Sequence, residues 1–179
     1  MNQSEFTLQV ERLIESLIDM SKKVDYISVE RKSIKQETRD FFNLMLSNVN
    51  VSELKAKTIY HIYIMLQIKK AALLKVIKEP IIPGAQIRQF YSLLKEKNSN
   101  YSPEENKLSA FVNAANFIYS EPHKLQVLLT AFGMMSKHAA SIEVILNTEA
   151  NKLTEELINE KFNDYINYCI LIYLIKIEQ

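Results

Sequence analysis

Glycine and proline are scarce in this sequence. Its 179 residues include 2 glycines and 4 prolines, whereas average usage would give about 12 and about 9. Folds built on β-sheets need many turns with positive φ, and glycine fills most of those positions. Phosphate-binding loops need glycine because the backbone must approach the ligand closely. Since Gly84 and Gly133 are far apart, the sequence excludes a P-loop and a dinucleotide-binding fingerprint and favours an all-α fold.

Cysteine and long apolar runs are scarce too. Cys169 is the only cysteine, which excludes an intramolecular disulfide and a thiolate metal cluster and fits a reducing compartment. Because Cys169 lies within an apolar run, we expect it to be a core thiol. The N-terminal segment carries acids such as Glu5 and Glu11, where a signal peptide would need a basic and then an apolar stretch. The longest apolar run, 168–175, is far shorter than the roughly 20 residues that cross a bilayer. We therefore expect a cytoplasmic protein with no membrane contact.

Helical periodicity is the dominant pattern in the rest of the sequence. Hydrophobic residues make up 47% of the chain and charged residues 24%, which is enough to bury a core. Apolar residues recur at spacings of three and four, which predicts a compact bundle of six or seven amphipathic helices without a substantial sheet. The β-branched and aromatic end of the last helix, 169–177, leaves a short strand as the alternative there. The expected helices cover residues 4–20, 28–47, 51–78, 85–97, 103–119, 121–146 and 153–176.

Two helix starts carry recognisable capping residues. Asn50 is expected to cap the third helix, with Glu53 completing a capping box. The run 102–105, Ser-Pro-Glu-Glu, has the cap, first-turn proline and acidic third position of a helix start. Both signals place a helix boundary without depending on tertiary contacts.

Prolines and a glycine in the segment 79–84 mark the best candidate boundary within the chain. Residues 1–79 are expected to form an N-terminal helical extension. They are expected to pack on a helical core of residues 80–179, so that the whole chain is one compact domain.

Charge is distributed unevenly along the chain, although the formal net charge is +1. Residues 1–54 carry 7 basic and 9 acidic side chains, residues 55–138 carry 12 and 5, and residues 139–179 carry 3 and 7. A basic middle segment between acidic ends favours a polyanionic partner. Ordinary solvated lysines on helix surfaces are the alternative, because polyanion binding needs the charges to cluster on one face.

No group of residues has the spacing of a catalytic or metal site. The histidines His61, His123 and His138 include no pair at i and i+4 and no zinc motif, and we expect His61 to be a packed histidine. The acidic pairs 104–105 and 155–156 belong to first helical turns, where they complement the helix dipole. We therefore expect no enzyme activity, no metal and no cofactor.

The segment 86–91 has a pattern that suits phosphate contact. Ile87 and Tyr91 share one helix face with Phe90, and Arg88 lies off that face. A helix that buries its aromatic residues and turns a planar guanidinium outward can bind phosphate. An ordinary amphipathic helix with a solvated or acid-paired arginine is the alternative.

The run 84–91, GAQIRQFY, resembles the signature of the helical small subunit of type III (Csm-type) CRISPR effector complexes. A following helix with Lys107 and Leu108, and the ending 162–168, are similar to the corresponding helices of that family. The resemblance covers about residues 83–175.

This resemblance implies a non-catalytic subunit that holds guide RNA and target RNA, alongside other effector-complex subunits and copies of itself, with no small-molecule substrate. Phosphate contacts carry no sequence information, which suits a subunit that must accept any guide. The alternative is a helical protein-interaction adaptor, or a viral or plasmid-encoded regulator, without nucleic-acid binding. The predicted RNA-binding residues, several of which are expected to converge on one exposed face, are Lys69, Lys70, Arg88, Lys95, Lys97, Lys124 and Lys137.

Overall fold

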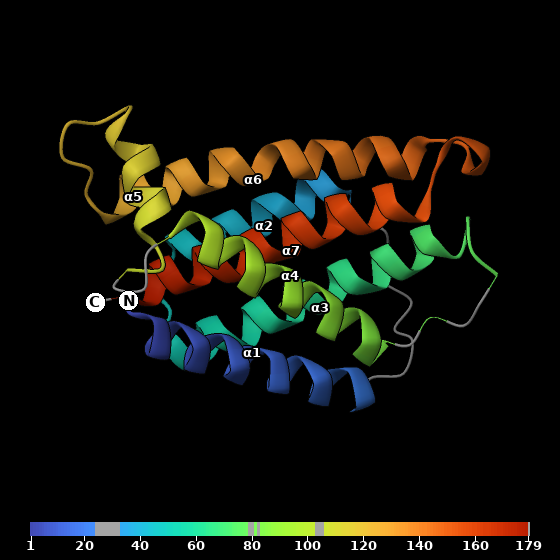
Figure 1. Cartoon of the computed structure of the whole chain (residues 1–179), viewed down its shortest axis with the longest axis horizontal. Coiled ribbons are helices and arrows are strands. Elements are labelled where there is room, and N and C mark those ends of the chain that lie inside the picture. Colours follow the sequence, from blue (N-terminus) through green and yellow to red (C-terminus); the bar gives the residue numbers. More distant parts are fainter. Residues whose placement is uncertain (24–32, 79–80, 82, 103–105, 179) are drawn as a thin grey trace.

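The chain folds as an all-α bundle in a computed structural model that describes residues 1–23, 33–78, 81, 83–102 and 106–178 (Figure 1). No strand occurs in these residues, so the all-α prediction is confirmed. None of the described helices combines the length and apolar character needed to cross a membrane. The helices are α1 (Gln3–Lys23), α2 (Ile34–Leu46), α3 (Val51–Leu73), α4 (Pro83–Tyr101), α5 (Ser109–Asn116), α6 (Lys124–Asn147) and α7 (Glu155–Ile177), with the short 3₁₀ helix η1 (Ala150–Lys152) before α7.

Helix α7 is the centre of the bundle. It contacts α6, α3, α4, α1 and α2, and Figure 1 shows it running between α6 on one side and α3 and α1 on the other. Its buried residues lie on all sides of the helix, which is the pattern of a helix enclosed by neighbours. The strand alternative for 169–177 is wrong, because packing on all sides overrides the β propensity of those residues.

One hydrophobic core joins the helices on both sides of the segment 79–84. Phe6 of α1 and Phe41 of α2 belong to the same buried cluster as Phe90 of α4 and Phe162 of α7. The N-terminal helices therefore supply part of the surface that covers α7.

Helix ends agree with the capping signals where the cap is local. Asn50 caps α3, because its Oδ1 accepts a hydrogen bond from the Glu53 backbone amide at 2.9 Å. Helix α6 continues through Gly133, as expected. The predicted start of the second helix at residue 28 lies outside the described residues, and α2 begins at Ile34 with Ser33 as its cap.

The region 98–119 differs most from the prediction. Helix α4 continues through the expected loop to Tyr101, and α5 covers only Ser109–Asn116. The capping run 102–105 lies largely outside the described residues. The Lys107 backbone amide donates to the Met1 carbonyl at 2.9 Å, and the Lys107 ammonium donates to the Ser102 carbonyl at 3.0 Å. These two contacts hold the turn before α5. The contact with Met1 joins residues far apart in the sequence, so no local sequence pattern encodes it.

Candidate functional site

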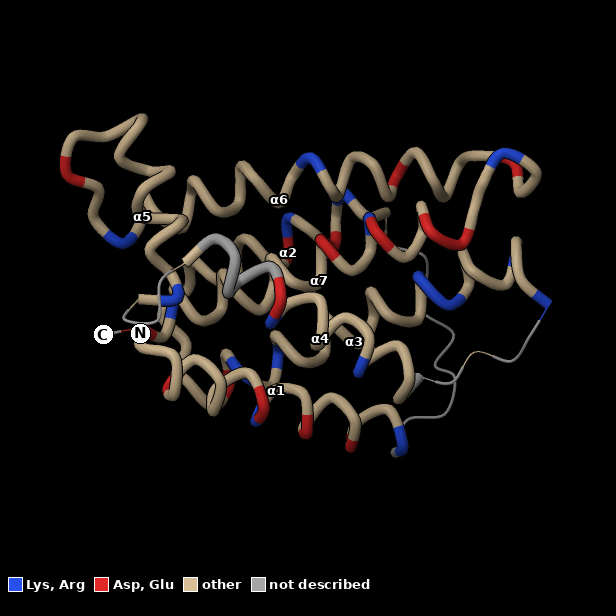
Figure 2. The backbone as a smooth tube through the Cα atoms, viewed as in Figure 1, with Lys and Arg blue, Asp and Glu red and all other residues tan. Residues whose placement is uncertain are grey.

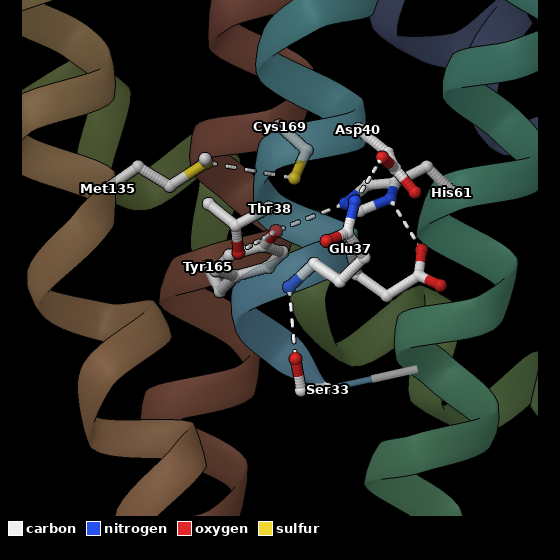
Figure 3. Close-up of polar contacts among 9 residues, drawn as sticks. Ser33, Glu37, Thr38, Asp40, His61, Met135, Tyr165 and Cys169 are labelled. Atoms are coloured by element: carbon white, nitrogen blue, oxygen red, sulfur yellow. Dashed lines mark hydrogen bonds and ion pairs between the residues drawn. The ribbon is translucent and has the colours of Figure 1, made fainter. Parts of the chain in front are cut away.

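A chain of polar side chains links α2, α3 and α7 inside the bundle (Figure 3). The Tyr165 hydroxyl lies 3.1 Å from His61 Nε2 and 3.1 Å from Thr38 Oγ1. His61 Nδ1 lies 3.6 Å from Glu37 Oε2, and the Phe41 ring stacks on the imidazole with centroids 4.6 Å apart. The packed-histidine prediction for His61 is confirmed.

This buried network is suited to joining helices. Burial raises the pKa of Tyr165 well above its usual value, and the neighbouring Cys169 adds to the rise. Burial also raises the pKa of the Cys169 thiol, so that the thiol stays neutral and unreactive. The Cys169 sulfur lies 3.9 Å from the Met135 sulfur (Figure 3). Because Cys169 is fully buried, the prediction of a core thiol is confirmed.

Among the predicted RNA-binding residues, Lys69 lies in the core and not on the surface. Its side chain is fully buried, and its ammonium donates to Asn163 Oδ1 at 2.7 Å. Burial lowers the pKa of Lys69 to about 8, although the charge of Glu155 acts in the opposite direction. The expectation that Lys69 lies on an exposed face is wrong. Position 69 is three residues after Leu66 and four before Leu73, so it belongs to the helix face that packs on the core.

Two cations of α4 lie at the surface, as the sequence predicts. Arg88 and Lys95 are exposed, and the structure shows no acidic side chain paired with either among the described residues. The Lys95 ammonium lies 5.2 Å from the centre of the Tyr91 ring, in a cation–π contact. Lys70 is half-buried on α3. The Lys97 side chain lies outside the described part of the structure.

The two α6 cations lie in different surroundings. Lys124 is the first residue of the helix and donates to the backbone carbonyl of Glu178, whose side chain pairs with the N-terminal ammonium of Met1. Partial burial and the charge of Lys176 lower the Lys124 pKa, and Glu178 partly offsets them. Lys137 is exposed in the middle of α6 and lines a pocket. The predicted cations are therefore spread over three helices.

Acidic and basic positions are interspersed on the described helices (Figure 2). Acidic positions follow α1, and α1 packs against α4. The Tyr91 hydroxyl of α4 donates to Glu11 of α1 at 3.2 Å, so the acidic face of α1 borders the α4 cations. A polyanion on α4 would therefore have to extend away from α1.

The pocket that Lys137 lines lies among α4, α5, α6 and α7 and has a volume of about 700 Å³. We call it the α4–α7 pocket. This volume is within the range of about 300–1,000 Å³ typical of small-molecule sites. Its apolar lining comes from Leu94, Ala110, Phe111, Ala114, Phe117, Met134 and Leu171, and its polar lining from Ser102, Asn113, Lys137, His138, Asp164, Asn167 and Tyr168.

Several polar groups of the α4–α7 pocket are arranged by contacts with one another. His138 Nδ1 lies 3.7 Å from Asp164 Oδ2, and the His138 ring lies 5.3 Å from the Tyr168 ring. The Phe111 ring meets Tyr168 edge-on at 6.1 Å. Asn167, in contrast, is only 4% exposed, and neither its amide nitrogen nor its amide oxygen has a hydrogen-bond partner among the residues that the structure describes.

Sequence reasoning missed this pocket. The only signal was a set of polar positions, Asp164, Asn167 and Tyr168, at or just before the start of the apolar end of the last helix. No family model matches the chain, and no curated protein or solved structure matches it. No group of three or more metal-binding side chains occurs in the described residues.

Proposed function

We propose that this chain is a non-catalytic RNA-binding protein that holds a single strand along α4 and over the α4–α7 pocket. The side chains in and around that pocket are the observation that supports the proposal. Lys137 and three aromatic side chains line it, and α4, which contributes Leu94 to its wall, carries the exposed cations Arg88 and Lys95. A basic surface beside aromatic rings is the usual arrangement of sequence-tolerant single-strand binding.

Arg88 has the most direct role in this proposal. Its guanidinium is on the surface side of α4, while Ile87, Phe90 and Leu94 are buried on the opposite side. A guanidinium presents a planar fork of donors that matches two phosphate oxygens, whereas an ammonium acts as a point charge. The contacts would be to phosphates, so RNA binding should be independent of sequence and should weaken with added salt.

The test is the affinity of the full chain for a fluorescent single-stranded RNA of about 20 nucleotides, measured by anisotropy at several salt concentrations. Arg88→Ala should weaken binding to all sequences about equally, by roughly 1–3 kcal/mol. Arg88→Lys should recover part of that loss, and the far-ultraviolet circular dichroism should stay unchanged. Arg39→Ala, which removes an exposed arginine from α2, is the matched control and should bind like the wild type. Equal RNA affinity of the wild type and Arg88→Ala would contradict the proposed role of Arg88.

A place in a type III CRISPR ribonucleoprotein is the more specific form of this proposal, supported by the resemblance of residues 84–91. In that form guide RNA and target RNA are the ligands, and other subunits and copies of the chain are the neighbours. Co-purification of the chain with a guide-containing particle is the observation that would support it.

A protein-interaction adaptor is the second candidate, and exposed apolar side chains on either side of the α5–α6 connection favour it. Phe117 is 94% exposed and Ile118 is 67% exposed after α5, and Leu125 and Leu129 are exposed on the first turns of α6. Exposed apolar side chains mark protein contacts where they form a contiguous patch. Failure of the wild-type chain to bind any RNA would make the adaptor the preferred function.

A further inference from the structure

The Asn167 amide is an unsatisfied hydrogen-bonding group at the wall of the α4–α7 pocket. One turn earlier on α7, Asn163 accepts a hydrogen bond from Lys69, whereas both polar atoms of Asn167 lack a partner among the described residues. An amide buried without hydrogen bonds destabilises the fold. The Ser102 hydroxyl, which also lines the pocket, is buried and likewise has no hydrogen-bond partner in the described part of the chain. A ligand in the pocket would supply the missing partners.

The shape of the Asn167 amide restricts what that ligand can be. Its oxygen accepts and its nitrogen donates, side by side in one plane. The complementary group is a planar edge with an adjacent donor and acceptor. Nucleobases carry such edges, and asparagine binds adenine in this two-bond manner in known complexes.

The rest of the wall fits a flat aromatic ring. The Phe111 ring of α5 meets the Tyr168 ring of α7 edge-on, and Tyr168 directly follows Asn167 in the sequence. Met134 and Leu171 add apolar surface. Unstacked bases bind against aromatic and apolar side chains of this kind. The volume of about 700 Å³ is in the range that holds a base together with its sugar.

Charges at the pocket are compatible with a nucleotide. Lys137 is exposed and lines the pocket, so its ammonium can meet a phosphate attached to the bound base. The Asp164 carboxylate would repel that phosphate, and His138, whose Nδ1 lies 3.7 Å from Asp164 Oδ2, would offset this repulsion only in its protonated form.

We propose that the α4–α7 pocket binds one unstacked nucleobase and that the Asn167 amide recognises its hydrogen-bonding edge. The base comes either from the RNA strand of the proposed function or from a free nucleoside or nucleotide. The inference depends on the proposed function only for the first source, so the two sources are tested separately.

The first arm of the test uses free nucleosides with the full chain. Adenosine, guanosine, cytidine and uridine are titrated separately, and binding is followed by calorimetry and by saturation-transfer NMR. At least one nucleoside should bind the wild type, and Asn167→Leu should weaken that binding roughly 5- to 150-fold, the range for one two-bond contact. Asn167→Leu should also keep or raise the melting temperature, because it removes a buried polar group that lacks partners. Loss of binding without loss of stability distinguishes recognition from folding.

A second variant tests the hydrogen-bonding edge itself. Asn167→Asp replaces the donor with a second acceptor, so binding should shift toward guanosine, whose edge presents two donors. Asn116→Leu, an exposed position of α5 outside the pocket, is the matched control and should leave nucleoside binding unchanged. An unchanged order of nucleoside affinities in a folded Asn167→Asp protein would overturn the role of Asn167.

The second arm repeats the RNA anisotropy measurement with Asn167→Leu. Weaker RNA binding together with nucleoside binding assigns the base to a strand, whereas unchanged RNA binding with nucleoside binding assigns the pocket to free nucleosides. RNA binding that Asn167→Leu does not alter, with no nucleoside bound at millimolar concentration, would overturn the pocket proposal and leave the RNA proposal standing. Nucleoside binding by a wild-type chain that binds no RNA would overturn the RNA proposal and leave the pocket proposal standing.

Discussion

Lys69 combines a charged side chain, which favours water, with a helix position that faces the core. It carries a cation, yet its place between Leu66 and Leu73 on α3 directs it into the core, where it donates to Asn163. Removing an ammonium from water favours its neutral form. The bond to Asn163 satisfies one donor without supplying an opposite charge.

Lys69 should make the stability of the protein depend on alkaline pH. Its pKa is about 8 in the folded state, below the ordinary lysine value of 10.5, so the unfolded chain binds more protons between these values. Stability therefore rises as the pH increases from about 8 to 10.5, and the cost of burying the cation is fully present below about 8. Lys69→Met removes this dependence. The free energy of unfolding of the wild type relative to Lys69→Met should increase by up to about 3 kcal/mol over that range.

Urea denaturation at several alkaline pH values measures this difference. Lys70→Met, which removes the neighbouring half-buried lysine, is the control for the loss of one positive charge. Parallel pH profiles for the wild type and Lys69→Met would show that the buried lysine does not change its proton affinity on folding.

At the scale of helices, the Tyr165 hydroxyl connects three elements. It contacts Thr38 of α2 and His61 of α3 from its own position on α7. Each of these partners is part-buried or buried, so neither can readily exchange the contact for water. The contact thus fixes how α2 and α3 are placed against the central helix.

Tyr165→Phe should lower the free energy of unfolding by roughly 1–3 kcal/mol, because it leaves two polar groups without this partner. Chemical denaturation followed by circular dichroism measures the loss. Tyr173→Phe is the matched control, since Tyr173 is a buried tyrosine of the same helix with no side-chain hydrogen bond to any described residue. Equal losses in the two variants would mean that the Tyr165 hydroxyl adds nothing to the joining of the helices.

Helix prediction succeeded where the pattern is local and continuous. The ranges 121–146 and 153–176 agree with α6 and α7 to within a few residues, because each is a long run with few breaking residues. The end of α4 and the start of α5 were wrong. A backbone contact from Lys107 to Met1 helps hold that turn, and residues this far apart leave no signal in a local window.

At the scale of the whole molecule, α7 depends on both halves of the chain for its burial. Helices α1, α2 and α3 cover one part of it, and α4 and α6 cover another part. The first residue also pairs with Glu178 beyond the end of α7. Each large apolar side chain that loses such cover costs about 1.5–3 kcal/mol.

The separate fragment 80–179 should therefore fail to unfold cooperatively, whereas the full chain should unfold in one transition. Thermal unfolding followed by both far- and near-ultraviolet circular dichroism distinguishes the two outcomes, because coincident curves indicate a single cooperative unit. Mixing the fragments 1–79 and 80–179 should restore part of the near-ultraviolet signal. A cooperative transition in fragment 80–179 alone would show that the C-terminal part is an independent domain.

The chain can be predicted to be helical from its sequence, because the scarcity of glycine and the three-to-four-residue spacing of apolar residues are local properties. The sequence also indicated that Arg88 lies off the apolar stripe of its helix. Only the tertiary structure decided that Lys69 is buried and that Asn167 lines a pocket with Ser102 and Phe111. The physical reason is that burial depends on which helices dock together. The residues of this pocket come from four helices, so no single helical pattern contains them.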